Sequence, residues 1–135
     1  MERTFIDLGL PSGRLWAARN EPDYLRFNEA VMTFGERLPS SDAFAELFEY
    51  CSRKWDWKRK GFLLTGPNGN TLFLNAAGSR YVGCGLDGCY WTSDAGVDGH
   101  DSKAISLLFN DAGFIPRLSS SRTHEFAIRL CKESK

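Results

Sequence analysis

Two stretches of apolar residues at three- and four-residue spacing predict two helices in the first half of the chain. The first stretch consists of Leu25, Phe27, Ala30, Val31 and Phe34. The second consists of Phe44, Leu47, Phe48 and Cys51. Asp23 and Ser40 are the expected N-caps, and Gly35 is expected to end the first helix with a positive φ. Each apolar stripe marks the face that packs inward.

Short apolar runs and alternating patterns predict strands on both sides of these helices. The predicted strands are residues 4–8, 15–18, 62–65, 71–75, 89–92, 103–109 and 124–131. The clearest signal is the hairpin 62–75, because Asn68-Gly69 lies between two strand-like runs and both residues are expected to take positive φ. In the last strand, Phe126, Ile128 and Leu130 are expected on one face, with Ala127 and Arg129 on the other.

Three further stretches are predicted to be connecting segments. Residues 53–60 read as a basic linker and residues 117–123 as a polar, serine-rich loop. Residues 78–102 contain six glycines. A segment of this length is typical of a functional or mobile loop, with residues 89–92 as the one strand signal inside it. Two strands, two helices and then a run of strands indicate an α+β fold built on antiparallel sheets.

Size and charge narrow the class of protein. A chain of 135 residues predicts a single domain covering residues 1–135. Its 17 basic and 17 acidic residues balance, which argues against nucleic acid or an anionic membrane as partner. No run approaches the ~20 apolar residues of a membrane span. The first residues lack a secretory signal pattern, so the location stays unassigned between cytoplasm, virion, and cell surface after signal removal.

An ordered set of motifs runs through the chain. The motifs are DLGLPSG-x-LWA (7–17), RLPS (37–40), GPNGNTLFLNAAG (66–78), YWTS (90–93) and FAIRLC (126–131). Together they resemble the Fibrobacter succinogenes major paralogous domain family. This family occurs in Bacteroidetes-type bacteria and their phages, including surface lipoproteins and fimbria-associated proteins. The resemblance implies a C-type-lectin-like fold: two helices packed on small antiparallel sheets, one joining the N- and C-terminal strands, with a long glycine-rich loop region. It implies a binding scaffold and names no ligand.

The predicted function is non-enzymatic recognition of a protein or carbohydrate ligand, as in adhesion. The binding surface is expected on the 78–102 and 117–123 loops, because aromatic and charged side chains there supply contact area and polar contacts. The candidate ligand-binding residues are Arg80, Tyr81, Asp94, Asp98 and Arg117. Tyr90 and Trp91 are further aromatic candidates, although Trp91 is expected in the core. The alternative is a structural or assembly subunit, such as a fimbrial tip, a phage virion piece or a homo-oligomer.

No residue is assigned a catalytic or metal-binding role. A G-x-S-x-G elbow is absent, and His100 and His124 lie in different regions of the sequence. No cofactor is expected. The alternative is a bound calcium ion, for which the available carboxylates are Asp87, Asp94, Asp98 and Asp101. Such a site needs about six to eight converging oxygens, and the sugar-binding motifs of C-type lectins are missing. A solvated acidic loop is therefore the preferred interpretation.

Four cysteines allow three pairings that the sequence does not distinguish. Free thiols are expected in the absence of an export signal. A Cys84–Cys89 disulfide is the alternative for an exported protein, and the resemblance to C-type lectins implies a Cys51–Cys131 bridge as another. A zinc site could use Cys84, Cys89 and His100 as ligands, but the sequence shows no fourth ligand for it.

Overall fold

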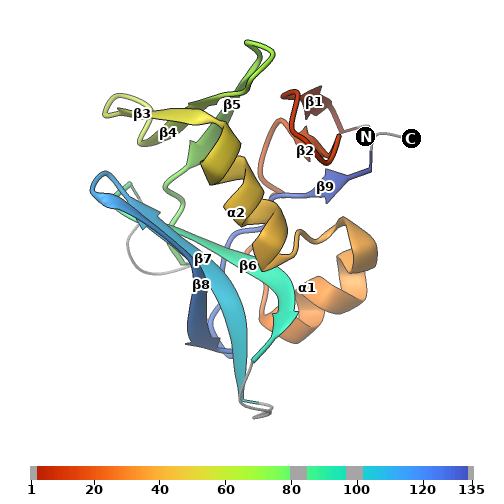
Figure 1. The fold of residues 1–135 in the computed structure, drawn as a ribbon. Coiled ribbons are helices and arrows are strands. Elements are labelled where there is room, and N and C mark those ends of the chain that lie inside the picture. Colours follow the sequence, from red (N-terminus) through yellow and green to blue (C-terminus); the bar gives the residue numbers. More distant parts are fainter. Residues whose placement is uncertain (1–2, 80–84, 97–101, 134–135) are drawn as a thin grey trace.

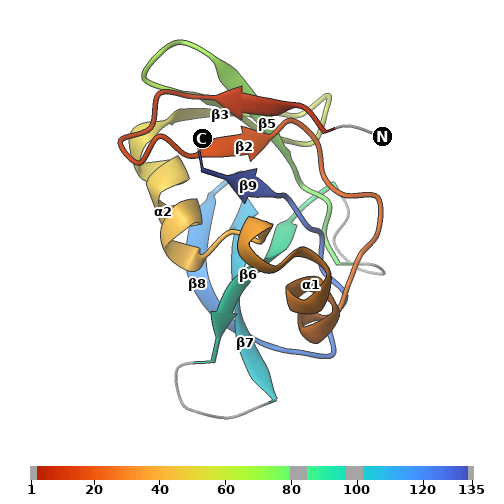
Figure 2. The ribbon, with the colours of Figure 1, turned by 90° about the vertical axis from the view of Figure 1, so that its right-hand side faces the viewer.

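The computed structural model describes residues 3–79, 85–96 and 102–133 and has an α+β architecture (Figures 1 and 2). This part of the chain contains two α-helices and three small antiparallel sheets, so the predicted class is confirmed. Neither of these helices is long and apolar enough to cross a bilayer.

Each sheet has three antiparallel strands. The first contains β1 (Phe5–Asp7), β2 (Leu15–Ala17) and β9 (Cys131–Lys132). The second contains β3 (Ser52–Asp56), β4 (Gly61–Thr65) and β5 (Thr71–Asn75). The third contains β6 (Gly88–Ala95), β7 (Lys103–Asn110) and β8 (Gly113–Ser121). The helices are α1 (Phe27–Phe34) and α2 (Ser41–Tyr50), and a 3-10 turn, η1 (Gly35–Arg37), lies between them. The N- and C-terminal strands meet in the first sheet, where β9 lies beside β2 (Figure 2).

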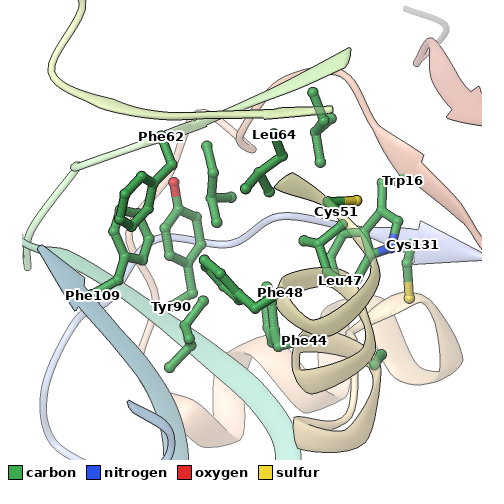
Figure 3. Packing of buried hydrophobic residues seen from close by; sticks show 14 of the residues in the cluster. Trp16, Phe44, Leu47, Phe48, Cys51, Phe62, Leu64, Tyr90, Phe109 and Cys131 are labelled. Atoms are coloured by element: carbon green, nitrogen blue, oxygen red, sulfur yellow. The ribbon is translucent and has the colours of Figure 1, made fainter. Parts of the chain in front are cut away.

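Helix α2 supplies the centre of the main hydrophobic core. Ser40 caps it by accepting a hydrogen bond from the Ala43 amide at 3.1 Å, as predicted. Its buried face carries Phe44, Leu47 and Phe48, which pack with residues of all three sheets (Figure 3). Fully burying each such side chain contributes roughly 1.5–3 kcal/mol. The core therefore holds the three small sheets together through one helix.

Helix α1 begins later than the apolar pattern predicts. Leu25 pairs with Phe126 through two backbone hydrogen bonds of 3.0 and 3.1 Å, which keeps the chain extended at this point. The N-cap is consequently Arg26 and not Asp23, with Glu29 accepting a hydrogen bond from the Arg26 amide at 3.0 Å. Gly35 ends the helix with φ +53°, as predicted.

The first half of the stretch predicted as a basic linker is strand β3, and residues 57–60 form the turn to β4. Arg53 pairs with Leu64 and Trp55 with Phe62 in the register with β4. The Arg53 guanidinium lies 4.8 Å from the centre of the Phe114 ring, and the Trp55 ring lies 5.0 Å from the Phe62 ring. The linker prediction was wrong for residues 53–56, where the apolar stem of a long basic side chain covers the core while its charge stays in water.

Much of the predicted binding surface is also regular sheet. Strand β6 occupies the middle of the 78–102 stretch and buries both Tyr90 and Trp91 completely. The core position expected for Trp91 is confirmed, and Tyr90 has no surface to offer a ligand. Strand β8 extends to Ser121, so most of the 117–123 stretch is not a loop. Ser120 in this stretch is buried, and its hydroxyl lies 2.9 Å from the hydroxyl of Ser106 in the neighbouring strand β7.

The closing segment does not form one long alternating strand. Residues 126–131 are all buried, including Ala127 and Arg129, which were expected on the face opposite to Phe126, Ile128 and Leu130. Backbone hydrogen bonds join this segment to neighbours on both sides: Ala17 N donates to Leu130 O at 2.9 Å, and Ala127 N donates to Cys89 O at 3.1 Å. Because neighbouring segments cover both sides of residues 126–131, the alternation in the sequence does not separate a solvent-exposed face from a buried one.

The hairpin between β4 and β5 forms as predicted, but its turn does not. Gly69 has φ +90°, whereas Asn68 does not take a positive φ. The side-chain amides of Asn68 and Asn70 instead donate to the Asp7 carbonyl at 2.8 and 2.9 Å. A side chain at Gly66 would meet the Leu8 carbonyl at 2.1 Å. The turn residues therefore dock the hairpin tip onto the end of β1.

Candidate functional site

A pocket of about 380 Å³ lies where connecting segments from different parts of the chain meet. Most of its wall is formed by residues 20–24 between β2 and α1, residues 59–60 at the end of the β3–β4 turn, and residues 75–77 at and just after the end of β5. Gly85 and Ala127 complete it. We call it the Asn20–Asn75 pocket. Its volume falls within the range of about 300–1,000 Å³ that is typical of small-molecule sites.

Hydrogen bonds within the β3–β4 turn place Lys60 in this wall. Asp56 Oδ1 accepts hydrogen bonds from the amides of Lys58 and Arg59, both at 3.0 Å. Lys60 then takes φ +64° and its amide donates to the Asp56 carbonyl at 2.8 Å. Its own carbonyl accepts from the Ala76 amide at 2.9 Å. Lys60 is the one non-glycine residue with positive φ in the described ranges, a conformation that costs free energy and gathers at functional sites.

Beneath the pocket wall lies the fully buried guanidinium of Arg129. Its Nε donates to Asn20 Oδ1 at 2.7 Å, and its Nη2 donates to Asn75 Oδ1 at 2.9 Å. Nη2 also donates to the Phe73 carbonyl at 2.8 Å, and Nη1 donates to the Ala17 carbonyl at 3.1 Å. All four acceptors are neutral oxygens.

The charge of Arg129 therefore has no carboxylate partner among the described residues. Burial lowers the pKa of this guanidinium, and the neighbouring Tyr90 opposes that shift. An arginine is nevertheless not deprotonated in a protein, so the positive charge persists. A buried cation is tolerated when its N–H groups are hydrogen-bonded, and here the two asparagines and two carbonyls provide those bonds.

Tyr90 reinforces the same arrangement. Its hydroxyl lies 2.7 Å from the Asn75 carbonyl and 3.1 Å from Asn20 Oδ1, and it donates to one of these oxygens. Burial raises the pKa of Tyr90 to about 12, so this donor stays protonated at any physiological pH. The Oδ1 atoms of Asn20 and Asn75 are thus held on the Arg129 side.

The side-chain amides of Asn20 and Asn75 belong to residues that line the pocket. Within the described ranges neither Nδ2 donates a hydrogen bond, whereas each Oδ1 accepts one from Arg129. An amide whose oxygen is held by a cation is fixed in orientation, and its N–H groups are polarised as donors. The two residues therefore bring to the pocket wall two amides of fixed orientation whose N–H groups have no partner in the described part of the chain.

The charged residues at the rim are partly paired. Glu21 forms a bidentate ion pair with Arg3, with nitrogen–oxygen distances of 2.8 and 2.9 Å. Arg59 pairs with Asp56 at 2.8 Å. Lys60 makes no ion pair with the described part of the chain.

Two of the residues predicted to bind a ligand lie at another place, the first turn of α2. Asp94 Oδ2 accepts a hydrogen bond from the Ser41 amide at 3.0 Å and another from the Ser41 hydroxyl. Arg117 forms an exposed ion pair with Asp42. Neither residue lines the Asn20–Asn75 pocket. Arg80, Tyr81 and Asp98 lie outside the described residues.

Sequence reasoning missed the pocket, although a signal was present. Arg129 occupies the middle of an otherwise apolar segment, and a charged residue that is buried there has to be paired or hydrogen-bonded. Of its partners, Asn20 follows one predicted strand and Asn75 is the last residue of another, positions at which asparagine is typical of a strand end. Only the fold shows that these positions converge.

The described residues contain no group of three or more His, Cys, Asp or Glu side chains arranged for a metal ion. Several candidates for calcium or zinc, namely Asp98, Asp101, Cys84 and His100, lie outside the described residues.

The cysteines that the structure describes are free thiols. Cys51 and Cys131 are buried in the main core near Trp16 (Figure 3), so the bridge implied by the resemblance to C-type lectins is not formed. Burial raises the pKa of each of these thiols to about 11, which makes them poor nucleophiles at neutral pH. Cys89 is partly buried and its pKa is raised to about 11 for the same reason. The Cys84–Cys89 pairing involves a residue outside the described ranges.

Three comparisons with known proteins bear on identity. No family model matches the chain, and neither a curated protein nor a solved structure matches it. The geometry of the pocket is therefore the basis on which a function is proposed.

Proposed function

We propose that this protein is a non-enzymatic recognition module that binds a small polar ligand, carried on a glycan or a protein, in the Asn20–Asn75 pocket. The observation that carries the proposal is the pair of asparagine amides whose oxygens are held by the buried Arg129. Donors fixed before the ligand arrives reduce the entropy lost on binding. The pocket has the size of a small-molecule site and is lined by both polar and apolar groups.

We further propose that the module has a C-type-lectin-like fold. The motifs between residues 7 and 131 that resemble the Fibrobacter succinogenes major paralogous domain support it. The pairing of β2 with β9, which joins the two ends of the chain, and the two helices packed on small antiparallel sheets are consistent with it. A recognition role fits such a scaffold, because connecting segments between rigid elements carry the contacts.

The test begins with a search for ligands and ends with pocket variants. The full chain is screened on a glycan array, with and without a calcium chelator, and by peptide display. The affinity of each captured ligand is then measured for the variants Asn75→Ala and Lys60→Gln. Asn28→Ala, on the exposed surface of α1, is the matched control. Melting temperatures establish that the variants remain folded. We expect both pocket variants to weaken binding and the control to bind as the wild type does. Ligands that bind all variants equally well refute the pocket as the site.

A second candidate is an assembly subunit, whose contacts with a partner would use exposed apolar side chains. Met32 on α1 is 87% exposed, Leu86 is 66% exposed and Trp57 is 59% exposed. Large apolar side chains in water are typical of protein–protein contacts when they gather in one patch. Light scattering over a concentration series distinguishes the two candidates, because an assembly subunit forms an oligomer that Met32→Ser or Trp57→Ser weakens. A monomer at every concentration excludes a homo-oligomer.

A further inference from the structure

We infer that the Asn20–Asn75 pocket takes the carboxylate of an acidic sugar, such as a uronic acid unit of a glycan. The inference rests on the proposed recognition function and names the chemistry of the ligand. Three features carry it: the balance of charge around the pocket, the hydrogen-bond donors in its wall, and the mixed polar and apolar lining.

Among the described residues, the charge balance leaves one positive charge without a counter-ion. Glu21 is neutralised by Arg3, and the Arg59 charge by Asp56. The remaining charges that this part of the chain places in the wall and beneath it are Lys60 and Arg129, both positive, and Asp23, which is negative. An anionic ligand supplies the missing negative charge. The Arg129 charge contributes to this attraction, because its guanidinium is shielded from water and its field is screened less than that of an exposed charge.

The donors match an acceptor-only group. Asn20 Nδ2 and Asn75 Nδ2 have no partner among the described residues, and the Lys60 ammonium is exposed at the same wall. A carboxylate accepts hydrogen bonds at both oxygens and donates none. Hydrogen bonds from polarised amides and an ammonium to a carboxylate belong to the strong, charge-assisted class. Arg129 does not touch the ligand and acts as a positioning residue through the two asparagines.

The rest of the lining favours a sugar over a simple acid. Sugar hydroxyls both donate and accept, and the wall offers the Asp23 carboxylate as an acceptor beside the amide donors. Pro22 and Ala77 in the same wall give apolar surface against which a pyranose ring packs.

The decisive variant is Asn75→Asp. It preserves the shape of the side chain and its bond to Arg129, but it replaces the Nδ2 donor by an acceptor and supplies the missing negative charge from within the protein. Asn28→Asp is the matched control. Asn28 Oδ1 also accepts from an arginine, Arg122 Nη1 at 3.3 Å, and the control adds the same charge to an exposed helix away from the pocket.

The experiment titrates the isotopically labelled full chain with sodium glucuronate, with glucose as the neutral analogue, and follows the side-chain amide signals of Asn20 and Asn75 by NMR. We expect saturable shifts with glucuronate and affinity weaker by about tenfold or more with glucose, as befits loss of charge-assisted hydrogen bonds. Asn75→Asp should lose glucuronate binding while its melting temperature is retained or raised. Asn28→Asp should bind glucuronate as the wild type does.

The outcomes separate this inference from the proposed function. Equal affinity for glucose and glucuronate, with both lost in Asn75→Ala, overturns the carboxylate inference and leaves the recognition pocket standing. Binding of a peptide with a free C-terminal carboxylate, together with no response to glucuronate, also overturns the acidic-sugar inference. Screened ligands that bind every pocket variant as tightly as they bind the wild type overturn the proposed function itself.

Discussion

Replacing Arg129 with methionine removes the cation that organises the pocket and four hydrogen bonds at once. Methionine fills most of the same space with a flexible apolar chain. It offers no donor to the Ala17 and Phe73 carbonyls, nor to the Oδ1 atoms of Asn20 and Asn75. We expect the variant to fold with reduced stability and to lose the fixed orientation of both asparagines.

The magnitude follows from two opposing contributions. Each hydrogen bond from a charged donor contributes about 1.5–3 kcal/mol, and a buried acceptor left without a partner costs about 1–3 kcal/mol. Against this stands the cost of keeping a guanidinium out of water, several kcal/mol, which methionine avoids. The two asparagine oxygens can turn toward solvent, whereas the two carbonyls cannot. We therefore expect a net loss of about 2–4 kcal/mol in the free energy of unfolding.

Urea unfolding followed by tryptophan fluorescence measures this loss. A domain of this size has an unfolding free energy of about 5–15 kcal/mol, so the variant remains folded but shows a clearly lower midpoint. Arg117→Met is the control, since that arginine makes an exposed ion pair whose removal is expected to cost about 1 kcal/mol or less. A loss at Arg129 no larger than at Arg117, or a gain, refutes the reasoning, because it means that the bonds do not outweigh the desolvation of the guanidinium.

Three further predictions concern the scaffold. Gly88→Ala places a Cβ 2.1 Å from the buried Phe109 ring and is expected to destabilise the fold by about 1–3 kcal/mol; an unchanged melting temperature would mean that the ring has room to move. Ser40→Ala removes the cap of α2 and should lower the urea midpoint by an amount equivalent to about 1 kcal/mol, and no change would show that the cap is dispensable. Burial raises the pKa of the Cys51 and Cys131 thiols from 9.0 to about 11, so the unfolded chain loses these protons first and the fold should lose stability as the pH rises through that interval. Thiol labelling near neutral pH should likewise be slow in the native protein and fast in denaturant, and equal rates would contradict the burial.

Local sequence signals predicted the elements whose causes are local. Ser40 caps α2 through a bond to a residue three positions away, and Gly35 ends α1 because glycine takes a positive φ at little cost. The hairpin β4–β5 and strand β7 were predicted from apolar runs and turn residues. These features depend on neighbours within a few positions, which the sequence displays directly.

The errors occurred where a distant partner decides the conformation. Residues 53–56 become a strand because β4 lies beside them, and residues 117–121 become a strand because they pair with β7. The start of α1 is set by Phe126, which pairs with Leu25 from the far end of the chain. Charge and serine content describe the outer surface of these strands and say nothing of the partner to which their backbones bond.

The amino-acid sequence by itself determined the class of fold, the position of α2 and the apolar residues available to the core. Only the tertiary structure decided the candidate site. Arg129 is separated by 54 to 112 positions from the residues whose oxygens it binds, and its burial is tolerable only because those oxygens arrive together. Hydrogen bonds act over about 3 Å, so a site assembled from such distant segments leaves no periodic trace in the chain. The pocket and its unbalanced charge are therefore properties of the folded molecule.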